Sequence, residues 1–226
     1  MKKFIAPPPE ATVKLAKRFF KHQKTQLYGF TLAEVLITLG IIGIISALTI
    51  PVLISNHKKK VIATQLKQSY SIIYNAIELS VAENETYENW NRPYNQPNST
   101  KKFAEQYILP YIKYAQTGQD KHFYANEDLF YIKLVNGTIV ALHVGSCVDF
   151  LVDINGDKQP NKGGVDQFTF YLNMFQNSAF PTGFSSGNKS RTKTQLILEC
   201  KNSPNNCAKL IEYENWKITK DYPQKI

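Results

Sequence analysis

The chain has 226 residues, enough for one globular domain with extensions, and a formal net charge of +9. A charge of this size is typical of nucleic-acid-binding proteins, but the first 29 residues hold seven basic side chains and a single acid. The remaining residues carry 20 basic and 17 acidic side chains, a formal charge of +3. So weak a charge gives no reason to expect nucleic acid as a partner.

An apolar stretch of 25 residues, from Phe30 to Ile54, follows the basic leader. About 20 apolar residues suffice for a helix that spans a bilayer. Seven basic residues precede the stretch and only Lys58, Lys59 and Lys60 follow it closely, which places the N-terminus in the cytoplasm and the remainder outside. A secretory signal peptide would have a shorter apolar core and a small-residue cleavage site, so this reading is disfavoured.

Glu34 is the only charged residue within the apolar stretch. Isolated carboxylates in membrane segments are rare and costly, which favours a functional role with a specific partner. The sequence Gly-Phe-Thr-Leu-x-Glu-Val-Leu begins at Gly29 and runs into the apolar stretch. It closely resembles the processing site of type IV prepilins and type II secretion pseudopilins.

The resemblance implies that prepilin peptidase, a membrane aspartic peptidase, cuts between Gly29 and Phe30 and that the new amino terminus of Phe30 is methylated. Glycine before the cut lets the backbone lie close to the catalytic carboxylates, because it lacks a Cβ. The resemblance further implies that Glu34 pairs with the amine of Phe30 on a neighbouring subunit. An unpaired charge in apolar surroundings is costly, so the pair would fix the register of assembly. The implied partners are prepilin peptidase, an inner-membrane assembly platform and identical or related pilin-like subunits bound through the N-terminal helix.

From Thr31 the chain predicts one long helix, which Gly40 and Gly43 weaken and Pro51 bends. Beyond Lys60 the pattern becomes amphipathic, with apolar residues at helical spacing. The members of this stripe are Leu66, Tyr70, Ile73, Ile77 and Val81. We expect a globular domain to pack over them.

The rest of the chain predicts an antiparallel sheet with short helices. Asn136-Gly137, between apolar runs, is the strongest short-range signal for a hairpin. Strands are expected over 129–135, 138–144, 147–154, 167–172 and 195–200; helices over 103–114 and 207–216; and a loop over 84–100.

These elements predict an α+β fold of pilin-like layout, in which a long N-terminal helix packs against a small antiparallel sheet. The helix has a transmembrane half and an amphipathic half. The expected organisation is a cleaved leader (1–29), a transmembrane and assembly helix (30–54), its amphipathic continuation (55–83) and a globular extracytoplasmic domain (84–226).

Oxygen-bearing side chains alternate in the segment that begins Asp153-Ile-Asn155-Gly-Asp157 and ends at Asp166. Calcium takes six to eight oxygen ligands, and the first three of these residues match the start of an EF-hand-like loop. The match then fails, because glycine falls at the fourth position rather than the sixth. Some pseudopilins hold calcium in their sheet domain, so the resemblance favours a calcium site at Asp153, Asn155, Asp157 and Asp166. The alternative is a surface turn between two strands.

The three cysteines are compatible with an oxidising exterior. Cys200 and Cys207 bracket a polar loop with turn-forming residues, which favours a disulfide between them. Cys147 lies in a strand-like stretch and is expected to be a buried thiol. Sequence alone leaves other pairings open.

No catalytic residues are identified, and the chain is not expected to be an enzyme. The four histidines have no metal-ligand spacing, and no phosphate loop or nucleophile elbow occurs. The sequence therefore predicts a structural subunit of a type IV pilus-like or type II secretion pseudopilus filament. It would reside in a bacterial inner membrane as a single-pass protein, and later in a filament in the periplasm or at the cell surface. The alternative is a membrane-anchored extracytoplasmic binding module, with or without calcium, that does not polymerise.

Overall fold

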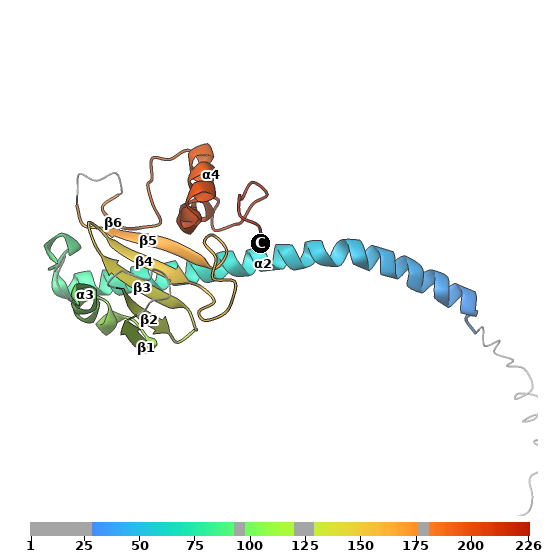
Figure 1. Ribbon diagram of the computed structural model, residues 1–226, viewed down its shortest axis with the longest axis horizontal. Coiled ribbons are helices and arrows are strands. Elements are labelled where there is room, and N and C mark those ends of the chain that lie inside the picture. Colours follow the sequence, from blue (N-terminus) through green and yellow to red (C-terminus); the bar gives the residue numbers. More distant parts are fainter. Residues whose placement is uncertain (1–28, 93–97, 120–128, 176–180) are drawn as a thin grey trace, which may run out of the picture. The chain divides into compact units, whose positions relative to one another are not determined.

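The computed structural model describes residues 29–92, 98–119, 129–175 and 181–226 (Figure 1). The predicted leader, apart from Gly29, lies outside the described residues. The chain divides into two compact units, residues 1–50 and 51–226. The second unit contains the sheet and the shorter helices.

The predicted long helix is confirmed as α2, Leu32–Asn84, which contains Gly40, Gly43 and Pro51 without interruption. Proline removes one intrahelical hydrogen bond, but it does not end this helix. From Leu32 to Ile50 every apolar side chain is exposed. By length and composition, this part of α2 could cross a membrane.

The second unit holds a six-stranded sheet in which each strand pairs antiparallel with the next along the chain. The strands are β1 Tyr114–Gln119, β2 Phe130–Leu134, β3 Ile139–Val144, β4 Val148–Asp153, β5 Gln167–Asn173 and β6 Gly183–Ser185. The first four predicted strands are confirmed as β2 to β5. The sequence interpretation did not find β1 or β6.

The hairpin at Asn136-Gly137 is also confirmed. Gly137 has a φ of +90°, a value that glycine adopts without the steric cost of a Cβ. Its N–H donates to the carbonyl of Leu134 at 3.0 Å, and Leu134 N donates to the carbonyl of Thr138 at 2.8 Å. The turn thereby sets the register between β2 and β3.

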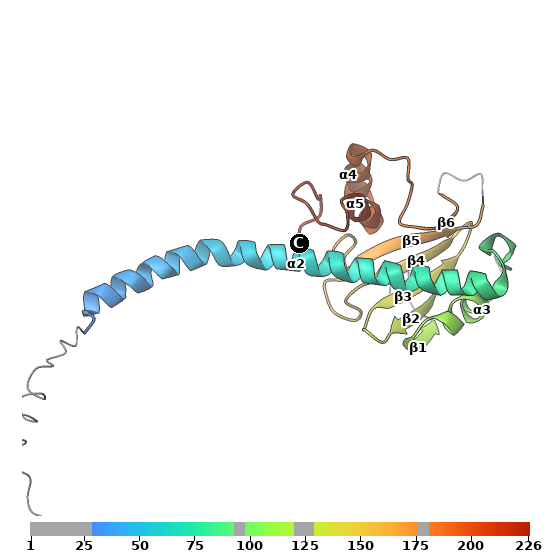
Figure 2. The same cartoon turned by 180° about the vertical axis from the view of Figure 1, so that it is seen from behind.

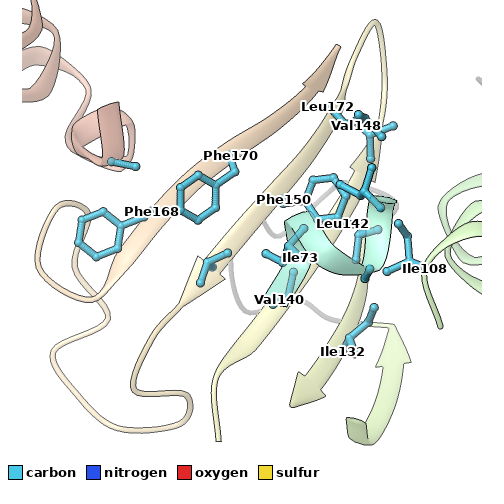
Figure 3. Close-up of a cluster of buried hydrophobic side chains, with 14 of the residues drawn as sticks. Ile73, Ile108, Ile132, Val140, Leu142, Val148, Phe150, Phe168, Phe170 and Leu172 are labelled. Atoms are coloured by element: carbon cyan, nitrogen blue, oxygen red, sulfur yellow. The ribbon is translucent and has the colours of Figure 1, made fainter. Parts of the chain in front are cut away.

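The apolar stripe of α2 covers one face of the sheet, as Figure 2 shows from the helix side. Leu66, Ile73 and Ile77 are buried, and Tyr70 and Val81 are partly buried. They meet alternate residues of the central strands, where Leu142 lies opposite Phe150 and Phe150 opposite Phe170 (Figure 3). Burial of this apolar surface is the main stabilising contribution to the unit.

Short helices complete the core. The described ones are α3 Ser99–Tyr107, α4 Lys193–Asn202, α5 Ala208–Tyr213 and the 3-10 turns η1 Tyr87–Asn89, η2 Leu109–Tyr111 and η3 Pro204–Cys207. The helix predicted over 103–114 therefore ends early, and β1 begins at Tyr114. The loop predicted over 84–100 contains η1 and the start of α3, while residues 93–97 lie outside the described residues.

The strand predicted over 195–200 was wrong, because this segment belongs to α4. Thr192 and Gln195 form a capping box: the Thr192 hydroxyl accepts from Gln195 N, and the Gln195 side chain accepts from Thr192 N. Leu196 and Cys200, one helical turn apart, are both buried. The cap and the one-sided burial stabilise helix over strand.

Candidate functional site

The candidate processing and assembly site lies at the first turn of α2. Thr31 N and Thr31 Oγ1 both donate to Glu34 Oε2 at 2.8 Å, and Glu34 N donates to Thr31 Oγ1 at 3.2 Å. This arrangement is a capping box, which satisfies backbone groups that helix termini otherwise leave unpaired. Glu34 therefore has a role within its own helix that the sequence interpretation missed, although the Thr-x-x-Glu spacing indicates it.

The cap engages only one oxygen of the Glu34 carboxylate. Among the described residues, Glu34 Oε1 has no hydrogen-bond or ion-pair partner. The cap also turns the carboxylate back toward the N-terminal end of the helix, where Phe30 lies. The Glu34 side chain can thus cap its own helix and still present an oxygen to a cation.

Gly29 and Phe30 precede the helix in exposed backbone. Phe30 is 88% exposed, and a Cβ added to Gly29 would meet no described atom within 4 Å. The described residues therefore give no steric reason for glycine at position 29. A requirement for it by a peptidase that contacts this backbone is compatible with the space around it.

Of the predicted calcium residues, Asp153 ends β4 and the others lie between β4 and β5. Hydrogen-bond donors within the chain already bind the carboxylates of Asp153 and Asp166. Asp166 is buried and accepts from Asn161 N at 2.9 Å, from Lys162 N and from Asn155 Nδ2 at 3.1 Å. Asp153 is also buried and accepts from Asn155 N and from the side chain of Gln167 at 3.2 Å each.

Asp157, in contrast, is exposed and forms an ion pair with Lys133. The described residues contain no group of three or more His, Cys, Asp or Glu placed to hold a metal ion. Two buried acceptors of the loop, Asn155 Oδ1 and Asn161 Oδ1, have no hydrogen-bond partner in the described part of the chain. They are oxygens of the kind that calcium binds, and the calcium site stays a prediction.

Cys200 and Cys207 are joined by a disulfide bond and are fully buried. The bond ties α4 to η3, and Gly164 of the loop before β5 lies against it, since a Cβ at Gly164 would be 3.0 Å from Cys207 Sγ. The disulfide therefore joins α4 to η3, and the loop that carries Asp166 packs against it.

A protein-family model matches residues 52–226, more than half of the chain, and is described as a family of unknown function (DUF6613). The chain belongs to this family. Neither the curated proteins nor the solved structures gave a match. The part matched by DUF6613 includes the sheet, the Asp166 loop and the disulfide, whereas the Gly29–Glu34 segment precedes it.

Within the DUF6613 part, the outer face of the sheet carries an open groove of about 650 Å³. Its lining includes His143, Asp149 and Tyr171 from the strands and Asn206 from η3. His143 Nδ1 lies 3.7 Å from Asp149 Oδ2, and Tyr171 donates to Asn206 Oδ1 at 2.8 Å. The groove presents both polar and apolar surface and could accept a ligand with polar groups.

Cys147 beside this groove is half-buried rather than fully buried as expected. Its thiol donates to Asp149 Oδ1 at 3.1 Å. Burial, followed by the nearby Asp149 charge, raises the pKa of Cys147 to about 12. A thiol that stays protonated at neutral pH is a poor nucleophile, which argues against a catalytic role for it.

Proposed function

We propose that this protein is a structural subunit of a pilus-like or type II secretion pseudopilus filament. In this proposal the chain enters the inner membrane with its N-terminus in the cytoplasm and its sheet unit outside. Prepilin peptidase cuts between Gly29 and Phe30, and the processed subunit polymerises through α2. The protein performs no catalysis.

The observation that carries the proposal is the state of the Glu34 carboxylate. A simple membrane anchor gains little from an acid in its apolar segment, whereas a filament subunit needs one to meet the amine that cleavage creates. The cap holds Glu34 Oε2 and leaves Oε1 available, so the side chain is preorganised before any neighbour arrives. Preorganisation lowers the entropy lost on association.

Two further features support assembly. The apolar part of α2 is exposed over its whole circumference, so it can be covered by lipid before assembly and by neighbouring helices afterwards. The exposed Gly29-Phe30 backbone is accessible to a peptidase. Both features are needed if one chain is first a membrane protein and then a filament subunit.

The alternative is a membrane-anchored binding module that does not polymerise. The groove over His143, Asp149 and Tyr171 supports it, because such a module needs a ligand site away from the membrane helix. This alternative gives no role to Glu34 Oε1 or to glycine at position 29. We therefore prefer the filament subunit.

Mass spectrometry of the protein isolated from its own membrane tests the proposal. We expect an N-terminus at Phe30 that carries one methyl group. An intact leader on protein that is correctly localised and functional would refute the processing step. A processed N-terminus without any filament would instead favour the anchored module.

A further inference from the structure

We propose that the turns of α2 just beyond the apolar stretch, together with the segment after α5, form a binding site for the phosphate groups of anionic phospholipids. The site is a groove of about 430 Å³ whose lining includes Lys59, Lys60 and Thr64 of α2 and Trp216 and Lys217 of the C-terminal segment. It goes beyond the filament role and rests only on the part of that proposal in which α2 spans a membrane.

The position of the groove along α2 matches the lipid head-group layer. Lys59 lies five residues beyond Ile54, which is about 7.5 Å along a helix. Each head-group layer of a bilayer is roughly 5–8 Å thick. If the apolar stretch ends at the edge of the hydrocarbon core, then Lys59 and Lys60 lie at the depth of the lipid phosphates.

The groove carries positive charge that the protein does not neutralise. Among its described lining residues three are lysines and none is acidic. No ion pair in the described part of the chain involves Lys59, Lys60 or Lys217. These lysines therefore keep their charge available for an anion.

The acids closest in sequence to the groove are occupied elsewhere. Lys193 of α4 binds Glu214 at 2.7 Å and Asp221 at 3.0 Å. These ion pairs hold both carboxylates on Lys193, so the C-terminal segment contributes Lys217 to the groove without an opposing acid.

Trp216 is the aromatic component of the groove. Its ring centroid lies 5.3 Å from that of Tyr70, and its backbone N–H donates to the carbonyl of Ile211 at 2.8 Å, which holds this residue against the end of α5. Trp90 Nε1 donates to the carbonyl of Glu85, but Trp216 Nε1 has no acceptor among the described residues. A half-buried indole with a free donor suits the membrane interface, where tryptophan is enriched.

A second cavity, of about 560 Å³, adjoins the same turns of α2. It is lined on the α2 side by His57 and Lys58 and on the other by Lys225 and the buried Asp166. Basic residues therefore flank α2 on more than one face at this level. In Figures 1 and 2 the C-terminal end of the chain lies beside α2, in agreement with these cavities.

The test uses the full, uncleaved chain in dodecyl maltoside micelles and follows the fluorescence of Trp216. Trp90 is buried and supplies a constant background. The probes are dihexanoyl phosphatidylglycerol, dihexanoyl phosphatidylcholine and inorganic phosphate. We expect half-saturation by phosphatidylglycerol at a concentration at least about tenfold lower than by phosphatidylcholine, because each lysine near anionic lipid contributes roughly a fivefold preference.

The triple variant K59Q/K60Q/K217Q should lose this preference for phosphatidylglycerol completely. The single variant K217Q should lose part of it. The matched control K67Q/K113Q/K201Q removes three exposed lysines elsewhere in the second unit and should keep it. Equal binding of the two lipids, equal loss in the control, or saturation by inorganic phosphate at the same concentration would overturn the proposal. Because the assay involves neither cleavage nor polymerisation, its failure leaves the filament proposal standing.

Discussion

Thr31 and Glu34 form reciprocal hydrogen bonds at the start of α2. Thr31 donates twice to Glu34 Oε2, and its hydroxyl accepts from Glu34 N. The carboxylate that we propose for assembly is thus also a helix cap. Replacing Glu34 by alanine removes both functions and cannot separate them. Two other substitutions can.

Glu34→Gln keeps an oxygen that can cap the helix but removes the charge. We expect normal amounts of processed protein in the membrane and no filaments, measured by immunoblotting and by negative-stain electron microscopy. Thr31→Val removes the capping hydroxyl, at a cost of about 1 kcal/mol to the helix start, but keeps the charge. Filaments should persist at reduced yield. Parent-like assembly of the Glu34→Gln variant would contradict the charge-pair role.

Because a Cβ at Gly29 would meet no described atom within 4 Å, a substitution there tests cleavage separately from folding. We expect Gly29→Val to block cleavage while membrane insertion and folding continue. Uncleaved precursor would accumulate, as measured by its mass. Gly40→Ala is the matched control, since its Cβ also enters open space within α2 and should leave cleavage unchanged. Cleavage of the Gly29→Val variant at the parent rate would show that position 29 does not determine recognition.

Local signals in the sequence were sufficient to predict α2 and the β2–β3 hairpin. The spacing from Leu66 to Val81 fixes one buried helix face, and Asn136-Gly137 admits few conformations other than a turn. The apolar segment from Gln195 to Cys200 was ambiguous by periodicity, and its capping box with Thr192 was the overlooked signal. β1 is largely exposed and polar, so only its pairing with β2 defines it. Likewise, the sequence motif was sufficient to identify Glu34 as a candidate residue. The groove lined by Lys59 and Trp216 could not be predicted, because it depends on tertiary packing between distant segments.

The loop before β5 should depend strongly on Asp166. Asp166→Ala removes the acceptor of two backbone N–H groups and one side-chain amide, and we expect a loss of about 2–4 kcal/mol in the free energy of unfolding. Asp157→Asn, which removes the charge of an exposed ion pair with Lys133, should cost at most about 1 kcal/mol. Chemical denaturation of both variants measures these losses.

The calcium prediction is tested on the parent protein by thermal denaturation. If calcium binds in this loop, EGTA should lower Tm and added Ca²⁺ should restore it, because a ligand that binds only the folded state stabilises it. The Asp166→Ala variant should not respond. The same Tm with and without EGTA would contradict the calcium prediction. The loop would then be held by its hydrogen bonds alone.

The disulfide should stabilise the second unit. Its short ring reduces the entropy of the unfolded chain, which corresponds to about 2–3 kcal/mol. We expect C200A/C207A to lower Tm by roughly 5–10 °C. Dithiothreitol should lower the Tm of the parent by a similar amount and leave that of the variant unchanged. An equal response of both proteins to the reductant would mean that the bond does not contribute.

Two partly buried tyrosines should make the second unit sensitive to alkali. Burial raises the pKa of Tyr222, whose hydroxyl donates to the carbonyl of Gly164 at 2.6 Å. Burial, followed by the charges of Glu212 and Tyr74, raises the pKa of Tyr70 to about 12. Unfolded tyrosine titrates near pH 10, so above that pH the unfolded state loses protons that the folded state retains. This contribution to stability is therefore complete below about pH 10 and is lost as the pH rises toward the folded pKa values.

Each such tyrosine should reduce the free energy of unfolding by up to about 1.4 kcal/mol per pH unit above pH 10. Tyr222→Phe should be about 1 kcal/mol less stable than the parent at pH 8, because it loses one hydrogen bond. It should then lose less stability than the parent between pH 9.5 and pH 11.5, so that the two urea-unfolding curves converge. Tyr213→Phe, at an exposed position, is the control and should follow the parent throughout. An equal loss of the free energy of unfolding in the Tyr222→Phe variant and the parent would mean that ionisation of the Tyr222 hydroxyl does not oppose folding. The alkaline sensitivity would then have to come from Tyr70 or from the lysines.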